Sequence, residues 1–165
     1  MGRVIIILVL VAVQAIFGAP AWLLPDGAPY WVRAVSYSFF HGSWWHLAVN
    51  SLAIWSIYRP DRPCKPCRDF LFPFIIAVLV YPLSFRPVIG FSNILYACLG
   101  LRTPPLSSPW WKQSSVIVFL VVTVALVFIP RFSATTHIAA FLLGMAGASL
   151  NRFYQSITND AKRYF

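Results

Sequence analysis

Six apolar runs separated by short polar loops constrain the fold of this chain more than any other feature. The first run, residues 4–24, is long enough to cross a hydrocarbon core about 30 Å thick at a rise of about 1.5 Å per residue. The later runs are shorter and cover residues 43–58, 70–85, 92–101, 116–129 and 134–150. Because 59% of the 165 residues are hydrophobic and only 10% are charged, a small water-soluble domain has too little interior for them. The pattern predicts an all-α membrane protein, a single domain over residues 1–165 with a bundle of six transmembrane helices in contact with the lipid bilayer.

The basic residues predict how the chain is oriented. If the N-terminus is cytoplasmic and the chain crosses six times, ten of the thirteen Lys and Arg residues lie inside and three outside. The inner ones are Arg3, Arg59, Arg62, Lys65, Arg68, Arg102, Lys112, Arg152, Lys162 and Arg163, and the outer ones are Arg33, Arg86 and Arg131. This favours a multi-pass protein of a prokaryotic inner membrane with both termini in the cytoplasm. Since the basic residues are scattered between apolar runs, the net charge of +9 does not indicate a nucleic-acid partner.

The first run has a second interpretation. Followed by Gly18-Ala-Pro-Ala21, it resembles a signal peptide with a small-residue cleavage site. Its length favours a retained span, and cleavage would leave five.

The loop between the second and third runs contains Cys64-Lys-Pro-Cys67. One CxxC without a second pair is a weak metal motif. On the inner side of the membrane we expect a reduced surface dithiol.

A few polar residues interrupt the apolar runs, where each is costly and therefore a functional candidate. His46 and Asn50 are four residues apart in the second run, so they share one helix face, and Ser92 and Tyr96 have the same spacing in the fourth. His137 lies close to the start of the sixth run. All three runs begin on the outer side, so these side chains should lie in one layer.

The start of the fourth run favours acyl-transfer chemistry. In Gly90-Phe-Ser92 a glycine precedes by two residues a serine that opens a helix, whose first amides can hold an oxyanion. A serine at this position, paired with His137, is the smallest set of side chains that can carry out acyl transfer. The four acidic residues of the chain are Asp26, Asp61, Asp69 and Asp160, of which the last three are on the inner side and the first in an outer loop. A third member orienting His137 would therefore be uncharged.

Together these motifs resemble the rhomboid family. His41-Gly-Ser-Trp-Trp-His46-Leu-Ala-Val-Asn50 is similar to the family's second-helix signature, and Gly90-Phe-Ser92 to its nucleophile motif. His137 with Gly144 seven residues later is similar to the family's sixth helix, and Arg33 to the arginine of its first loop. Order, spacing and topology agree over nearly the whole chain.

The resemblance implies catalytic roles. Ser92 would attack the scissile carbonyl and His137 would act as its base. The Ser92 amide with the side chains of His46 and Asn50 would form the oxyanion hole. The implied function is that of an intramembrane serine endopeptidase that cleaves transmembrane segments of membrane-protein substrates, with no metal or other cofactor.

It also implies supporting roles. Tyr96 matches a tyrosine that packs against the catalytic histidine, and His41 matches a structural position. The fifth run and residues 131–133 match the family's substrate gate.

The sixth run carries small residues at Ala140, Gly144 and Ala148, a stripe suited to close helix packing. Asn93 departs from the family, in which glycine often follows the serine. Its side chain can crowd the contact between the fourth and sixth helices, reshape the site or supply a hydrogen bond. From the sequence we expect Asn93→Gly to keep or raise activity.

Two other functions remain open at this stage. A catalytically silent rhomboid-like protein would bind membrane clients, but such a protein is expected to lack the serine or the histidine. A metal site of His41, His46 and His137 is disfavoured if His41 and His46 share one helix, because residues five apart then diverge by about 140°. It stays open if His41 lies in a loop. The sequence does not give the oligomeric state.

Overall fold

The structure is a computed structural model that describes residues 2–18, 29–58, 67–84, 89–105, 107–109, 114–127 and 133–161. Within these residues the chain is helical and has no strand, which confirms the all-α prediction. The helices are α1 (Gly2–Phe17), α2 (Tyr30–Ser36), α3 (Trp44–Ile57), α4 (Phe72–Val80), α5 (Ser92–Leu101), α6 (Ser114–Val127) and α7 (Ala134–Ala161). Three short segments add the 3-10 turns η1 (Tyr37–Phe39) and η3 (Tyr81–Leu83) and the π-helical turn η2 (Cys67–Leu71).

Each predicted apolar run forms a helix, with differences at the ends. The run at 92–101 coincides with α5. The first helix ends at Phe17, because Gly18 adopts a left-handed φ of 68° and its amide donates to the Gln14 carbonyl at 2.9 Å. The predicted ends at residues 24, 85 and 129 lie outside the described residues, as do residues 19–21 of the possible cleavage site and Cys64.

The structure has more helix than was predicted in two places: one predicted helix is longer, and one loop contains short helical segments. The sixth run was expected to end at residue 150, but α7 continues to Ala161. Residues 151–161 contain no Gly or Pro, so their polarity ends the apolar run without ending the helix. The segment between the first and second runs contains α2 and η1, which are too short to show as an apolar run.

The third run contains Pro73 and Pro82, and a proline in a helix interior kinks the helix. Pro73 instead lies in the first turn of α4, where its missing N–H costs nothing, and Pro82 lies in η3 after the helix has ended. The nine-residue α4 therefore has no proline in its interior.

Measured by length and hydropathy together, none of the helices in the described ranges is sufficient to cross a membrane.

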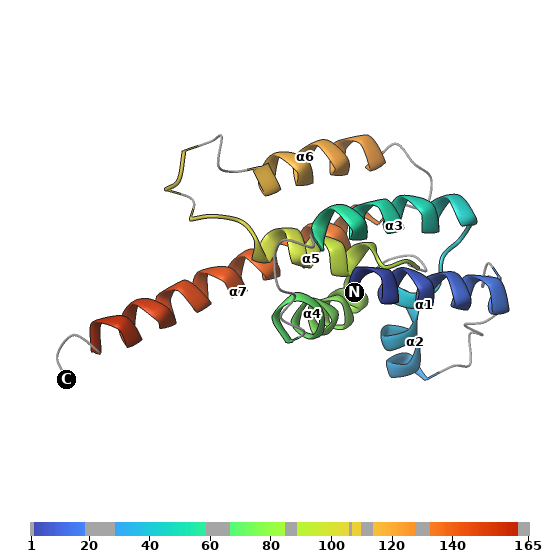
Figure 1. Cartoon of the computed structure of the whole chain (residues 1–165), viewed down its shortest axis with the longest axis horizontal. Coiled ribbons are helices and arrows are strands. Elements are labelled where there is room, and N and C mark those ends of the chain that lie inside the picture. The colour runs from blue at the N-terminus through green and yellow to red at the C-terminus, as the bar shows by residue number, and fades with distance from the viewer. Residues whose placement is uncertain are drawn as a thin grey trace.

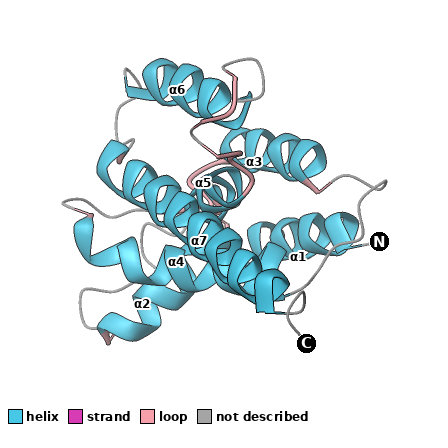
Figure 2. Ribbon diagram, turned by 90° about the vertical axis from the view of Figure 1, so that its left-hand side faces the viewer, coloured by secondary structure: helices cyan, strands magenta, loops and turns pink. Residues whose placement is uncertain are grey.

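Helix α5 is at the centre of the bundle, with α1 and α3 on one side, α4 on another and α7 running alongside it (Figures 1 and 2). Seven of its ten residues are buried. Leu95 and Cys98 belong to the hydrophobic cluster shared with α1 and α3, whereas Tyr96 and Ala97 belong to the cluster shared with α6 and α7. The helix that carries the candidate nucleophile is thus held from several sides, while the C-terminal part of α7 projects from the bundle (Figure 1).

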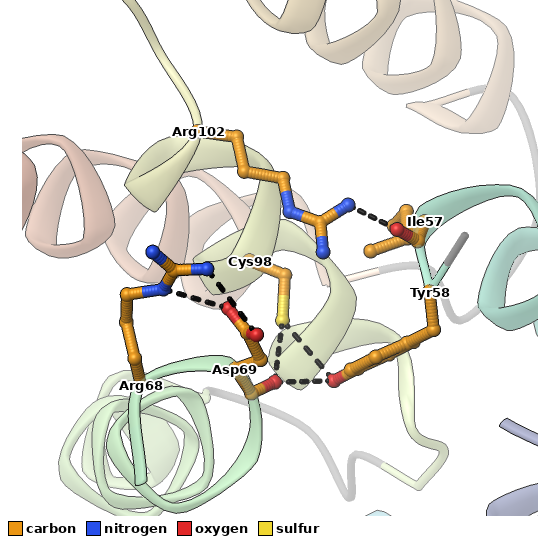
Figure 3. Close-up of polar contacts among 6 residues, drawn as sticks. All are labelled: Ile57, Tyr58, Arg68, Asp69, Cys98 and Arg102. Atoms are coloured by element: carbon orange, nitrogen blue, oxygen red, sulfur yellow. Dashed lines mark hydrogen bonds and ion pairs between the residues drawn. The ribbon is translucent and has the colours of Figure 1, made fainter. Parts of the chain in front are cut away.

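The C-terminal end of α5 is fixed by a group of polar contacts that we call the α5 anchor: Ile57, Tyr58, Arg68, Asp69, Cys98 and Arg102 (Figure 3). The Arg102 guanidinium donates to the Ile57 carbonyl at the end of α3. The Tyr58 hydroxyl donates to the Asp69 carbonyl at 2.6 Å and lies 3.3 Å from Cys98 Sγ. These contacts join α3, η2 and α5 at the end of α5 opposite to Ser92.

Candidate active site

Ser92 and His137 lie within hydrogen-bonding distance. Ser92 is the first residue of α5, and His137 lies in the first turn of α7. The distance between Ser92 Oγ and His137 Nε2 is 2.7 Å. The structure thus brings together two residues 45 positions apart that the sequence analysis paired.

The other ring nitrogen of His137 has a backbone partner. Its Nδ1 lies 2.5 Å from the Ser133 carbonyl oxygen, one helical turn earlier. Since a carbonyl only accepts, Nδ1 carries the proton, and Nε2 is left to accept from the Ser92 hydroxyl. The positions of the acidic residues predicted that an uncharged group orients His137. In the structure this group is a main-chain carbonyl, which cannot be recognised from the sequence.

Close packing of α5 and α7 holds this pair together. The predicted stripe of small residues, Ala140, Gly144 and Ala148, is buried along α7. Small residues allow two helix backbones to approach, and the approach brings the starts of α5 and α7 side by side.

Aromatic rings support the imidazole. The Tyr96 and His137 rings meet edge to face, with centroids 4.7 Å apart, as the resemblance implied. Phe119 from α6 packs on Tyr96 with centroids 5.6 Å apart, and the Thr123 hydroxyl donates to the Tyr96 oxygen at 3.4 Å. Helix α6 thus reaches the site through two side chains, whereas many of its other residues are exposed.

The expected oxyanion residues lie against Gly90. A Cβ at Gly90 would be 2.6 Å from His46 Cε1 and 3.4 Å from Asn50 Nδ2, so both side chains crowd this glycine. Its φ of 121° is in the region that favours glycine. Asn50 Nδ2 is buried and has no hydrogen-bond partner among the described residues. A donor without a partner among the described residues therefore lies against the glycine that comes two residues before Ser92.

His41 lies behind this group, on the loop before α3. It is fully buried, and its ring contacts the His46 ring edge to face with centroids 5.1 Å apart. Burial lowers the pKa of His41 to about 3, and the neighbouring His46 contributes to the shift. A neutral, buried ring fits the structural position that the resemblance implied.

The three histidines are not arranged as the ligands of one metal ion. Both ring nitrogens of His137 are engaged, by Ser92 and by Ser133. Within the described part of the chain no three His, Cys, Asp or Glu side chains come together as metal ligands.

Arg33 lies half-buried on α2, and its Nε has no hydrogen-bond partner among the described residues. The structure shows no contact of its side chain with Ser92 or His137.

Asn93 is fully buried. Its amide nitrogen donates to the Tyr37 hydroxyl at 3.0 Å. The sequence left open whether the Asn93 side chain crowds the helix contact, reshapes the site or supplies a hydrogen bond, and the structure shows the hydrogen bond. Tyr37 is a residue that the sequence analysis missed.

The described helices thus hold a serine at the start of α5 against a histidine in the first turn of α7. The Rhomboid domain family model matches residues 28–152, which include every site residue described above. The chain belongs to the rhomboid family. No curated protein and no solved structure matches it at a significant level.

Proposed function

We propose that this chain is an intramembrane serine endopeptidase with Ser92 as nucleophile and His137 as general base. The observation that carries the proposal is the 2.7 Å contact between Ser92 Oγ and His137 Nε2, with the histidine tautomer set by the Ser133 carbonyl. Membership of the rhomboid family, whose members are in general serine proteases of the membrane, supports it.

The reaction follows from this geometry. Ser92 Oγ attacks the scissile carbonyl carbon while its proton passes to His137 Nε2. When the tetrahedral intermediate collapses, the imidazolium returns that proton to the leaving amine, and the acyl chain remains on Ser92. A water molecule then attacks the ester by the same path in reverse, with His137 again as the base.

Negative charge that develops on the carbonyl oxygen needs donors. The Ser92 amide opens α5 and has no partner inside the helix. Asn50 Nδ2 lies next to Gly90 without a partner in the described residues, and His46 lies beside it. We assign the oxyanion hole to these three groups.

The membrane setting is part of the proposal. The apolar runs and the distribution of basic residues support six spans with cytoplasmic termini, which places Ser92 near the outer surface. Transmembrane segments of other proteins are the proposed substrates. They would enter beside α6, whose exposed apolar side chains include Leu120, Val121 and Val124, and unwind locally so that a carbonyl becomes accessible.

Labelling with a fluorophosphonate tests the pair directly. We expect the folded protein in detergent micelles to be labelled at Ser92, and Ser92→Ala and His137→Ala to lose both labelling and cleavage of a model transmembrane substrate. Ser56→Ala is the matched control, because this exposed serine is bonded, among the described residues, to the Leu52 carbonyl of its own helix. A folded protein that is neither labelled nor active would overturn the proposal and favour a silent protein that binds membrane clients.

A further inference from the structure

Tyr37 in the first loop makes contacts on both sides of the nucleophile. Its backbone carbonyl accepts from the Gly90 amide at 3.0 Å, two residues before Ser92. Its hydroxyl accepts from Asn93 Nδ2 at 3.0 Å, one residue after Ser92. Two hydrogen bonds to one residue thus bracket the segment that carries the serine.

Tyr37 is itself held firmly. Its side chain is fully buried, and its hydroxyl donates to the Ala77 carbonyl of α4 at 2.8 Å. Its ring also packs on Tyr81 of η3, with centroids 4.9 Å apart. Tyr37 therefore connects the first loop, α4 and the start of α5.

Any side chain at position 93 that bonds the Tyr37 hydroxyl must be a hydrogen-bond donor. A phenol has one proton, and Tyr37 gives it to Ala77, so the same oxygen can only accept from a further partner. The Asn93 amide supplies that donor, but its Oδ1 is buried with no partner among the described residues. A half-satisfied buried amide costs stability, so its presence beside the nucleophile indicates a task other than holding the fold.

We infer that Asn93 and Tyr37 are positioning residues that fix the Gly90–Asn93 segment so that Ser92 Oγ points at His137. This inference rests on the proposed function of Ser92. It replaces the sequence-based expectation that Asn93→Gly keeps or raises activity.

The test is a double-mutant cycle of Tyr37→Phe and Asn93→Ala in the full chain, read by the kinetics of fluorophosphonate labelling. We expect each single variant to lower the maximal labelling rate about 10-fold to 100-fold with little change in the probe concentration at half-maximal rate. Both changes break the contact between Asn93 Nδ2 and the Tyr37 hydroxyl, and Tyr37→Phe also breaks the bond to the Ala77 carbonyl. The double variant should therefore be no slower than the slower single variant. Asn93→Ala should change the thermal unfolding midpoint little, because the loss of the bond to Tyr37 is offset by the removal of Oδ1, which has no partner among the described residues.

Tyr58→Phe is the matched control. It removes another buried phenol hydroxyl, in the α5 anchor at the far end of the helix (Figure 3). It should lower the unfolding midpoint while Ser92 is labelled at the wild-type rate.

The outcomes separate the two proposals. If wild-type protein is labelled and Asn93→Ala is labelled equally fast, or if the two single effects multiply, the positioning role is overturned and the proposed function stands. If folded wild-type protein is not labelled at Ser92, the proposed function fails and the positioning role fails with it.

Discussion

Gly100 on α5 and Gly144 on α7 meet backbone to backbone. A Cβ at Gly144 would overlap the Ala97 carbonyl oxygen and lie 3.1 Å from Gly100 Cα, and a Cβ at Gly100 would overlap the Phe141 carbonyl oxygen. Neither position has room for one methyl group. This contact sets the separation of the two helices whose first turns carry Ser92 and His137.

Gly144→Ala should therefore weaken the protein and the site together. The methyl group meets backbone, which has little freedom to move aside, so α7 must shift away from α5. We expect a loss of about 1–3 kcal/mol in unfolding free energy, typical of an overpacked core, and a slower reaction of Ser92 with a fluorophosphonate. Denaturation in detergent and labelling kinetics measure the two effects.

Gly147→Ala is the matched control on the same helix. Its added methyl meets the end of the Phe72 side chain, which can rotate. If Gly147→Ala proves as damaging to labelling as Gly144→Ala, the glycine contact does not set the separation of the pair.

Gly90→Ala should be inactive. The substitution introduces strain at a φ of 121° and drives a methyl group into His46 at 2.6 Å. We expect the loss of substrate cleavage together with a lower unfolding midpoint.

Gly18→Ala is the control that separates backbone strain from the clash with His46 as the cause of lost cleavage in Gly90→Ala. Gly18 also has a positive φ, of 68°, but a Cβ there would meet no atom within 4 Å. It should lower the free energy of unfolding by about 1–2 kcal/mol, the cost of a Cβ in the left-handed region, and leave cleavage unchanged. Full activity of Gly90→Ala would show that the placement of His46 and Asn50 against this glycine has no part in the reaction.

Asn50→Ala should slow cleavage about 10²–10³-fold through kcat, as expected for the loss of one oxyanion donor. Because Asn50 Nδ2 has no partner in the described residues, its removal should change the unfolding midpoint little. Asn151→Ala, an exposed position on α7, is the control for the same substitution away from the site. If Asn50→Ala raised KM and left kcat unchanged, the assignment of Asn50 as an oxyanion donor would be contradicted.

Much of the candidate site could be predicted because its side chains interrupt apolar helices. His46, Asn50, Ser92 and His137 stand out as polar residues in such runs, and the order of the runs predicts their common layer. The start of α5 was predicted because Gly90 lies two residues before the serine that opens the run at 92–101.

What escaped prediction depends on the backbone or on contacts between distant segments. The Ser133 carbonyl has no side-chain signature, and Gly100 is recognisable only once it faces Gly144. Tyr37 looked like one of several aromatic residues in a loop, because its partners Ala77, Gly90 and Asn93 come from elsewhere in the chain.

The bond between His137 and Ser133 has a mechanical consequence. Ser133 directly precedes α7, and His137 lies in the first turn of α7. The imidazole and the carbonyl that orients it therefore move together when α7 tilts or slides. Such a movement lengthens only the gap to Ser92 and leaves the proton on Nδ1. A displacement of α7 would thus interrupt proton transfer from Ser92 to His137 without changing the histidine tautomer. When the helix returned, the hydrogen bond between Ser92 and His137 would form again with the proton still on Nδ1.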